Sequence, residues 1–385
     1  MSSASGLSRP AGVSGERTVS DTSSNPAKAP GEGNGQPAPK LTDAIRIGLC
    51  GIGRAGFKMV QRDLAKLPQT HVIGGFDLLE ERTRQLTEIC ASRAYSSYKQ
   101  MLKDPDLELI IVATRSHEHV PMAIAAMKAG KDVLVEKPMA LNLAGADRLI
   151  STAKKLGRRL FVRQNRRFDP PFLHAMEIVR SGKIGKLFEV QLRQGGFQRR
   201  SDWQTIKAFG GGQLLNWGPH VVDWGLQFIG GKAVSIWSDL KRIAAAGDAE
   251  DHVKLLLRGE SGIIADIEVS GANAFPQTPW RLLGSAGTLV IDAKNQCQLK
   301  YFNPSELPEI KASDQTPEGR SGSHFSSGDE IKWIEEQFPV SPAVQPNFWI
   351  ELYNSIRHGA QFPITLEEAR ETMQVITAAK RGTGF

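Results

Sequence analysis

Cysteine is scarce in this chain, and long hydrophobic runs are absent. The three cysteines are Cys50, Cys90 and Cys297. This odd and sparse set is no disulfide framework, and it suits a reducing compartment. No apolar run approaches the ~20 residues that are needed to span a bilayer. The sequence therefore predicts a cytoplasmic protein without a membrane partner.

Concentrated charge is also lacking. The net charge is +7, and the basic residues are spread without the runs that are typical of nucleic-acid-binding arms. We therefore expect no nucleic-acid partner. The densest basic cluster lies within residues 154–167. It is either a solvated helix end with local ion pairs or part of a site for an anionic cofactor or substrate.

Residues 1–41 have almost no large apolar side chains and are rich in Ser, Gly, Pro and Ala. Such a segment cannot bury enough surface to offset the entropy of ordering it. It also has no hydrophobic core region and no adjacent arginine pair, so it is not an obvious secretory or twin-arginine signal. We predict a disordered tail.

Strands and helices alternate with short connections over residues 42–165. Strands are predicted at 45–50, 71–76, 109–113, 133–135 and 160–162, and helices at 55–66, 78–91, 117–129 and 142–156. This alternation is typical of an α/β fold with a doubly wound parallel sheet. Because crossovers between parallel strands are right-handed, the predicted topology is that of a Rossmann domain.

The pattern changes over residues 166–385. A helix at 172–180 precedes strand-like runs at 187–194, 233–240, 252–258, 262–269, 280–284, 287–291 and 297–302. Gly-rich turns separate these runs, which predicts a mainly antiparallel sheet in an α+β domain. Residues 303–322 are expected to form a surface loop, and residues 347–381 two C-terminal helices.

A glycine-rich turn follows the first strand and opens a helix. Its residues are Gly51, Ile52, Gly53, Arg54, Ala55 and Gly56. Glycines at this spacing allow a tight turn, close approach of backbone to pyrophosphate, and packing of the helix on the strand. Asp77 ends the next strand, where a carboxylate accepts ribose hydroxyls and repels a 2′-phosphate. NAD is therefore favoured over NADP, although Arg82 and Arg84 lie nearby and leave NADP possible.

Glu136-Lys137-Pro138 follows a central strand. Ligands of open α/β sheets bind beyond the carboxyl ends of the strands, so Lys137 is placed to point into the crevice. Burial beside a cationic nicotinamide depresses the pKa of a lysine toward neutrality. Lys137 is therefore a candidate base for the hydroxyl proton of a substrate that loses hydride.

Residues 114–119 end another central strand with the sequence Thr-Arg-Ser-His-Glu-His. The two histidines lack further ligands at metal-binding spacing, so no metal site is predicted. We expect Thr114 or His117 to line the cofactor pocket. The structural alternative is that Ser116 caps the following helix.

Polar Asn216, His220 and Asp223 interrupt an apolar run that follows three glycines. If the segment is helical from Gly212, the three side chains share one face. If Pro219 instead occupies the first turn of a helix, Asn216 and His220 both lie at its N-terminus. Either arrangement brings them to one site.

Taken together, these segments resemble the Gfo/Idh/MocA oxidoreductase family, named for glucose–fructose oxidoreductase and inositol dehydrogenase. The resemblance covers about residues 44–385 and also rests on Lys131–Pro138, Asn165–Asp169 and the helices from Phe348. It implies an NAD(P)-binding Rossmann domain and a C-terminal domain whose large open sheet often serves in oligomer contacts. A homo-oligomer is therefore expected.

The resemblance also implies the chemistry, which is oxidation or reduction of a sugar or cyclitol hydroxyl. It assigns the cofactor-side carboxylate to Glu136, the catalytic lysine to Lys137, and an Asp-x-x-x-His pair to Asn216 and His220. The chain departs from this pattern at Asn216, because an amide cannot take up a proton at neutral pH. It departs again at Arg115 and Ser116, where the family usually has Pro and Asn.

The leading hypothesis is an NAD-dependent oxidoreductase acting on a carbohydrate-like alcohol, with Lys137, His220 and Asn216 as catalytic residues. Arg163, Trp203 and Asp223 are expected to line the substrate pocket. One alternative is a glycosidase with tightly held NAD, which shows no net redox change. Another is a non-catalytic NAD-binding protein, suggested by Asn216 alone. The identity of the substrate stays open.

Overall fold

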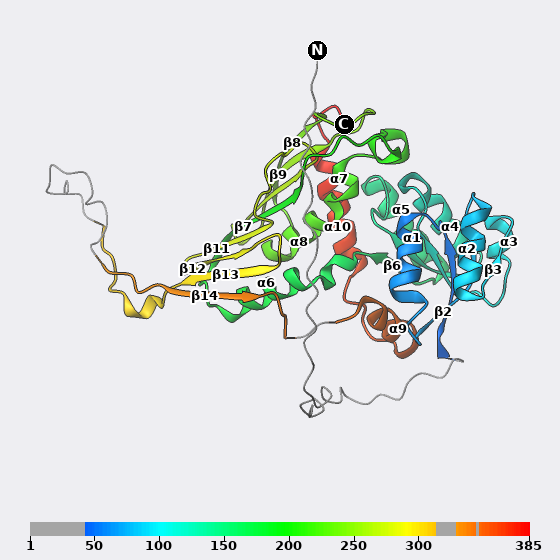
Figure 1. The fold of residues 1–385 in the computed structure, drawn as a ribbon, viewed down its shortest axis with the longest axis horizontal. Coiled ribbons are helices and arrows are strands. Elements are labelled where there is room, and N and C mark those ends of the chain that lie inside the picture. Colours follow the sequence, from blue (N-terminus) through cyan, green and yellow to red (C-terminus); the bar gives the residue numbers. More distant parts are fainter. Residues whose placement is uncertain (1–42, 313–328, 344–345) are drawn as a thin grey trace, which may run out of the picture. The chain divides into compact units, whose positions relative to one another are not determined.

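The computed structural model describes residues 43–312, 329–343 and 346–385 (Figure 1). The predicted disordered tail lies outside these residues, as does the second half (313–322) of the expected surface loop at 303–322. The part of that loop that is described contains one short 3-10 turn, Pro304–Glu306. None of the helices in the described ranges is long and apolar enough to cross a membrane.

The first sheet has six strands that pair only in parallel, in the order β3-β2-β1-β4-β5-β6. The strands are β1 (Ile45–Cys50), β2 (Thr70–Phe76), β3 (Arg93–Ala94), β4 (Leu109–Val112), β5 (Asp132–Glu136) and β6 (Leu160–Arg163). The order reverses between β1 and β4, which opens a crevice at their carboxyl ends. The predicted doubly wound Rossmann sheet is confirmed.

Helices connect these strands. They are α1 (Arg54–Met59), the π-helical turn η2 (Val60–Leu64), α2 (Glu80–Cys90), α3 (Tyr98–Leu102), the 3-10 turn η3 (Ser116–Glu118), α4 (His119–Lys128) and α5 (Leu143–Leu156). The pattern of apolar residues did not reveal β3 and α3, because two and five residues are too few for a period to show. The expected helix at 55–66 is an α-helix that continues as a π-helical turn.

The second sheet has eight strands in the order β14-β13-β12-β11-β7-β10-β9-β8. They are β7 (Leu187–Gly195), β8 (Ser235–Lys241), β9 (His252–Arg258), β10 (Ile264–Ser270), β11 (Trp280–Gly284), β12 (Gly287–Ile291), β13 (Gln296–Tyr301) and β14 (Ile334–Pro339). Only β7 and β10 pair in parallel. The predicted mainly antiparallel sheet is confirmed, and β14 is an additional edge strand that the sequence reading missed.

One face of this sheet packs on helices α6 (Pro170–Ser181), α8 (Gly218–Ile229) and α10 (Leu366–Ala379) (Figure 1). Burial alternates along the strands, so that Val253, Leu255 and Leu257 of β9 point toward the helices. The other face carries partly exposed charged side chains. On it, Asp266 pairs with Arg193 at 2.5 Å and with Lys254 at 2.6 Å.

The helix α9 (Phe348–His358) returns from the C-terminal part of the chain to the first sheet. Its residues Phe348, Trp349 and Leu352 share a buried cluster with the side chains of β1. Arg357 donates hydrogen bonds to the carbonyls of Asp43 and Ala44. The core beneath the nucleotide sheet therefore includes residues that lie 300 positions from β1 in the sequence.

Candidate active site

The glycine turn joins β1 to α1 with its backbone nearly in contact with neighbouring strands. Gly51 has φ +88°, and a Cβ there would lie 2.6 Å from the backbone of Ala113. A Cβ at Gly56 would lie 2.1 Å from the Gly51 carbonyl oxygen. At Gly53, by contrast, the only atom of the described residues within 4 Å of an added Cβ is Nη1 of Arg82, at 3.7 Å. Gly53 therefore leaves open space before the N-terminus of α1, where free N–H groups favour an anion.

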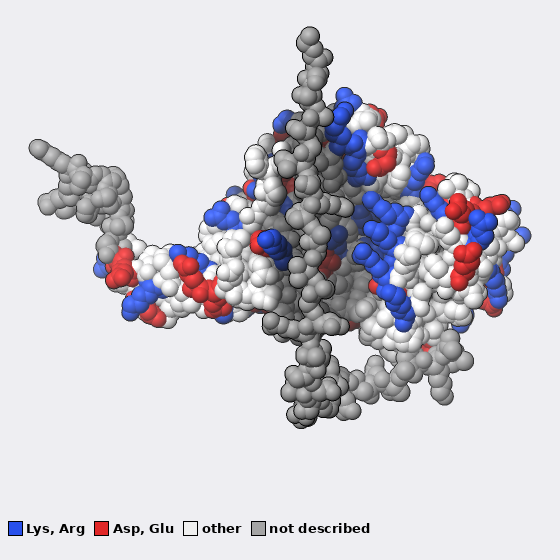
Figure 2. All heavy atoms as spheres, in the orientation of Figure 1, with Lys and Arg blue, Asp and Glu red and all other residues white. Residues whose placement is uncertain are grey.

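Basic side chains surround this opening. Arg54, Lys58 and Arg62 are exposed along α1 and η2, and Figure 2 shows a band of Lys and Arg over this helix. Asp77 lies at the end of β2, where its Oδ2 accepts a hydrogen bond from Ile52 N at 2.7 Å. Its Oδ1 lies 3.4 Å from Arg82 Nη1. The carboxylate thus ties the glycine turn to β2 and holds an arginine beside it.

Lys137 directly follows β5, and its side chain is half-buried. Its Nζ donates a hydrogen bond of 2.7 Å to the backbone carbonyl of Asn216. Burial lowers the pKa of Lys137 to about 8, opposed by the negative charge of Glu136 and assisted by the guanidinium groups of Arg166 and Arg163. An amine with this pKa exchanges protons near neutral pH.

Glu136 is held in place by its neighbours. Its Oε1 accepts a hydrogen bond from Arg163 Nη1 at 2.7 Å, and its Oε2 accepts one from Lys137 N at 3.1 Å. The Nε of Arg163 is buried and has no partner in the described chain. Arg163 therefore fixes Glu136 and keeps one donor available to a bound molecule.

Asn216 and His220 lie on either side of a break between two helices. Asn216 ends α7 (Gln213–Asn216), and His220 stands in the first turn of α8 behind Pro219. The second sequence-based alternative, with Pro219 in a first helical turn, is therefore the correct one. The ring of His220 lies 5.9 Å from that of Trp217, and its Nδ1 has no partner among the residues described.

Burial lowers the pKa of His220 well below its usual value, and the positive charges of Lys137 and Arg166 lower it further. The imidazole is therefore neutral at physiological pH. A neutral ring can donate from one nitrogen and accept at the other. In this environment His220 is better suited to orienting a hydroxyl than to holding a proton.

A chain of hydrogen bonds sets the orientation of the Asn216 amide. Arg200 can only donate, and its Nη2 bonds to Oε1 of Gln204. Gln204 Nε2 then donates to Oδ1 of Asn216 at 3.1 Å. Because Oδ1 accepts this hydrogen bond, the amide orientation is fixed and the Nδ2 hydrogens are the donors that the Asn216 side chain has left. No pattern in the sequence singled out Gln204, which lies between β7 and α7.

Thr114 and His117 lie at the carboxyl end of β4. Oγ1 of Thr114 and Nδ1 of His117 are buried without a partner in the described ranges. The His117 ring lies 5.4 Å from the ring of Phe209, which belongs to the loop between β7 and α7. Unpaired buried polar atoms at this edge fit a polar ligand in the crevice.

The neighbouring His119 is a buried core residue, with Nδ1 2.8 Å from the carbonyl oxygen of Pro138 and Nε2 3.2 Å from that of Thr114. Burial lowers its pKa, and the neutral ring can donate to only one of these two carbonyls. Ser116 is not the helix cap that the alternative reading assumed. The turn begins after Arg115, whose N–H donates to Oε2 of Glu118, and Ser116 is buried. In the described segments, no group of three His, Cys, Asp or Glu is placed to hold a metal ion.

Asp223 does not lie in the cleft, contrary to the expectation that it lines the substrate pocket. Its carboxylate is 1% exposed and forms two hydrogen bonds with Arg167, of 2.7 and 2.8 Å. Arg167 also pairs with Glu368 of α10 at 2.9 Å. The residue spacing identified the right helix face, but α10 covers it at this position. Asp223 therefore belongs to a buried ion-pair network.

Trp203 is partly exposed in the 3-10 turn Trp203–Thr205 of the β7–α7 loop. Within the described part of the chain, no ring contact or hydrogen bond links it to Lys137 or His220. Arg166 is a closer neighbour of this pair, since its charge acts on both. In the sequence it stood out as a member of a basic cluster and of the segment Asn165–Asp169, without a role of its own.

The fold and these side chains define a dinucleotide-binding protein with an ionisable amine at the nucleotide crevice. The comparisons agree. Residues 45–164 match the oxidoreductase family with an NAD-binding Rossmann fold (Gfo/Idh/MocA), and residues 172–290 match the Gfo/Idh/MocA C-terminal domain. The chain belongs to the Gfo/Idh/MocA family and is an NAD-binding oxidoreductase.

Among individual relatives, the uncharacterized oxidoreductase YhhX of Escherichia coli is 44% identical over 287 residues, covering 73% of this chain and 80% of the relative. The myo-inositol 2-dehydrogenase of Thermotoga maritima is 30% identical over 233 residues, covering 59% and 68%. The crystal structure of an NAD-binding protein from Listeria innocua aligns with a TM-score of 0.73 at 25% identity, covering 86% and 92%.

Proposed function

We propose that this protein transfers hydride between a hydroxyl or ketone of a sugar- or cyclitol-like substrate and a nicotinamide. The observation that carries the proposal is Lys137, a half-buried lysine at the carboxyl edge of the first sheet whose pKa desolvation lowers to about 8. Its charge acts on His220. The similarity to a myo-inositol 2-dehydrogenase supports a polyol-like substrate.

The proposed cofactor site consists of Gly51–Gly56, which receive the pyrophosphate, Asp77, which receives the ribose, and Thr114, His117 and Glu136, which border the crevice. When bound, NAD supplies the hydride acceptor. The open space at Gly53 and the unpaired atoms of Thr114 and His117 fit such a group.

Side chains of the protein then bind the substrate hydroxyl and take up its proton. Neutral Lys137 accepts the proton of the substrate hydroxyl, and the carbonyl of Asn216 keeps its Nζ in place. Nδ2 of Asn216 donates to the same oxygen and stabilises the negative charge that develops on it. Neutral His220 orients the hydroxyl, and the free donor of Arg163 contributes to substrate binding. Trp203 stays a proposed part of the pocket wall.

The experiment that tests this proposal identifies the copurifying nucleotide by mass spectrometry and then screens inositols, hexoses and glycosides at 340 nm. Formation of NADH with a polyol or sugar supports the proposal. Release of sugar from a glycoside without a change in absorbance would select the glycosidase instead. NAD binding with inactivity on the whole panel would select a non-catalytic protein.

We predict that Asp77→Asn shifts the preference from NADH toward NADPH. The substitution keeps an oxygen that accepts from Ile52 N but removes the charge that repels a 2′-phosphate, while Arg82 stays within reach. The ratio of the NADPH to the NADH dissociation constant, measured by fluorescence titration, should fall at least about tenfold. Glu88→Gln, which neutralises an exposed carboxylate on α2, is the control. An unchanged ratio in Asp77→Asn would contradict the role of this carboxylate.

We predict that Asn216→Asp moves the pH profile of oxidation upward. A carboxylate beside Lys137 favours its charged form, so the pKa of the amine rises from about 8 by about one unit. Oxidation needs the neutral amine, and its rate therefore increases with pH through that pKa and levels off above it. Asn216→Asp should shift the midpoint to higher pH, whereas Asn216→Ser should not. A shift to lower pH would disprove the argument.

We also propose that two copies pair through the partly exposed face of the second sheet, where Trp237 and Leu256 are 53% and 38% exposed. Light scattering after gel filtration tests this, and a monomer at micromolar concentration would refute it.

The unpaired thiols of Cys50, Cys90 and Cys297 support a cytoplasmic location, which cell fractionation checks.

A further inference from the structure

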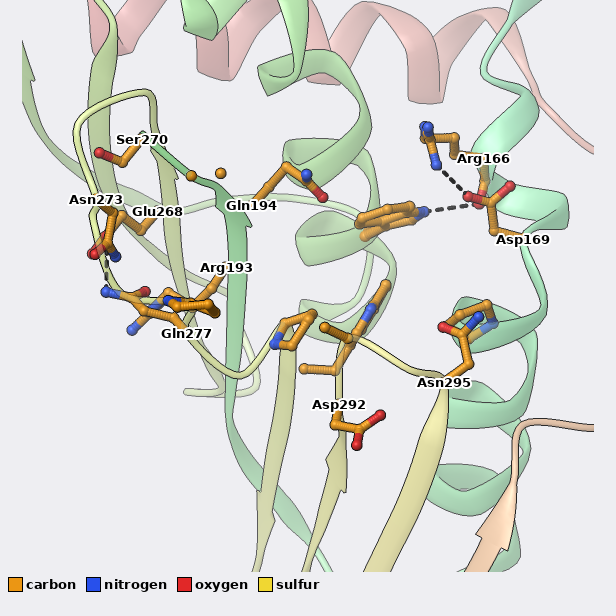
Figure 3. A pocket seen from close by; sticks show the side chains of 18 of the residues that line it. Arg166, Asp169, Arg193, Gln194, Glu268, Ser270, Asn273, Gln277, Asp292 and Asn295 are labelled. Carbon is orange, nitrogen blue, oxygen red and sulfur yellow. Dashed lines mark hydrogen bonds and ion pairs between the residues drawn. The ribbon is translucent and has the colours of Figure 1, made fainter. Parts of the chain in front are cut away.

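A cavity of about 450 Å³ lies in the C-terminal half of the chain, at the end of the second sheet (Figure 3). It sits where β7, β10 and β12 end, where β11 begins and where α6 starts. Figure 3 shows Arg166 and Asp169 on one side and Asn273 and Gln277 on the other. Its volume is within the range of about 300–1,000 Å³ that is typical of small-molecule pockets.

The cavity adjoins the proposed catalytic pair. His220 and Trp224 are four residues apart on α8, so they share one face of the helix, a single turn apart. Trp224 lines the cavity, and its Nε1 donates to the carbonyl of Arg166 at 3.0 Å. The guanidinium of Arg166 lies 4.4 Å from the centre of the Trp217 ring, which contacts His220. Arg166 therefore stands between the cavity and the reacting site.

Both arginines that line the cavity are paired with carboxylates, and Asp169, Glu268 and Asp292 add negative charge to its lining. Arg166 pairs with Asp169 at 2.7 Å, and Arg193 pairs with Asp266 at 2.5 Å. Gln277 donates to Glu268 at 3.2 Å. Because both arginines that line the cavity already face a carboxylate, the cavity is poorly suited to a phosphate or another strongly anionic group.

Uncharged planar groups supply the remaining hydrogen-bonding capacity. The side-chain amides of Gln194 and Asn295 form no hydrogen bond within the described ranges, and Asn273 uses only its Oδ1, which accepts from Phe275 N. Trp224, Trp280 and Phe275 contribute aromatic surface, and the Phe275 ring is 84% exposed. A neutral sugar ring fits this lining. The amides can donate to and accept from its hydroxyl groups, and the aromatic rings can pack against the face that carries its C–H groups.

We propose that this cavity is a second subsite, which holds a neutral, non-reacting sugar ring while the adjoining ring reacts at Lys137. The inference rests on the proposed function, because it names the substrate class of the same cleft. The preferred substrate is then a glycoside of at least two rings rather than a free monosaccharide or inositol.

Gly196 gives a direct way to block the cavity. It lines the cavity, and an added Cβ would meet nothing within 4 Å, so Gly196→Trp fills the space without a clash at the backbone. Gln194→Leu removes an amide at nearly constant volume. Lys154→Trp places the same bulky residue on an exposed part of α5 and serves as the control.

The experiment measures kcat/KM of the NAD-loaded protein for neutral disaccharides and for the matching monosaccharides, together with binding by saturation-transfer NMR. We expect a preference for the disaccharide of at least tenfold. Gly196→Trp should abolish this preference, Gln194→Leu should reduce it, and Lys154→Trp should retain it.

The outcomes separate the two proposals. Equal use of mono- and disaccharides, unaffected by Gly196→Trp, would overturn the subsite and leave the oxidoreductase proposal standing. Disaccharide binding that Gly196→Trp abolishes, without any turnover, would support the subsite and overturn the proposed reaction. Neither binding nor turnover with any sugar of the panel would overturn both.

Discussion

Lys137→Met is expected to lower the turnover number by about a thousandfold while the affinity for NADH changes less than about threefold. Methionine keeps the length of the side chain and removes the amine that exchanges the proton. General acid–base groups typically contribute 10²- to 10⁴-fold to rate, and about a thousandfold lies in the middle of that range. Steady-state assays at 340 nm and fluorescence titration with NADH measure the two quantities.

The size of this effect depends on the position of Lys137. The side chain is half-buried, and its amine donates to the carbonyl of Asn216. Desolvation and the charges of Arg166 and Arg163 lower its pKa, unlike that of an ordinary surface lysine. Lys128→Met, at an exposed position near the end of α4, is the matched control and should leave turnover unchanged. Retention of more than a tenth of the activity in Lys137→Met would remove Lys137 from the mechanism.

Arg167→Met is expected to destabilise the fold by about 3–5 kcal/mol, the range found when one partner of a buried ion pair is removed. The substitution leaves the carboxylate of Asp223 buried without its two hydrogen bonds, and Glu368 loses its partner in the same step. Because this network joins α8 and α10 away from Lys137, the variant should unfold at a lower urea concentration with little change in NADH affinity at low temperature.

Two further variants make the result interpretable. Glu335→Gln breaks the pair with Lys300, whose side chains are 67% and 52% exposed, and should change stability by less than about 1 kcal/mol. The double variant Arg167→Met, Asp223→Leu replaces the pair by apolar groups and should recover part of the loss. A stability of Arg167→Met equal to that of the unchanged protein would show that Asp223 finds another partner.

The sequence predicted well those features that depend on short stretches of chain. The alternation of apolar strands and amphipathic helices predicted both sheets, and the glycine turn was recognisable because two of its glycines meet a local steric demand. Gly51 needs a positive φ, and Gly56 has no room for a Cβ. Elements as short as β3 were not predicted, because two residues are too few to show the alternation of apolar and polar side chains.

Asp223 shows where the same reasoning stopped. Its spacing from His220 is determined by the helix, but the partner that faces it is not. Arg167 reaches it from 56 residues away, and α10 closes the site from the C-terminal part of the chain. Gln204 was missed for the same reason, because only the fold brings it next to Asn216.

By itself, the sequence determined the class of fold, the dinucleotide turn and the place of Lys137 at the end of a central strand. These follow from local backbone geometry and from the two-residue and 3.6-residue periods of strands and helices. Only the tertiary structure decided the pKa of Lys137, the orientation of the Asn216 amide and the exclusion of Asp223 from the cleft. Each of these three features depends on burial and on contacts with residues from distant segments. Burial and such contacts arise only when the chain has packed.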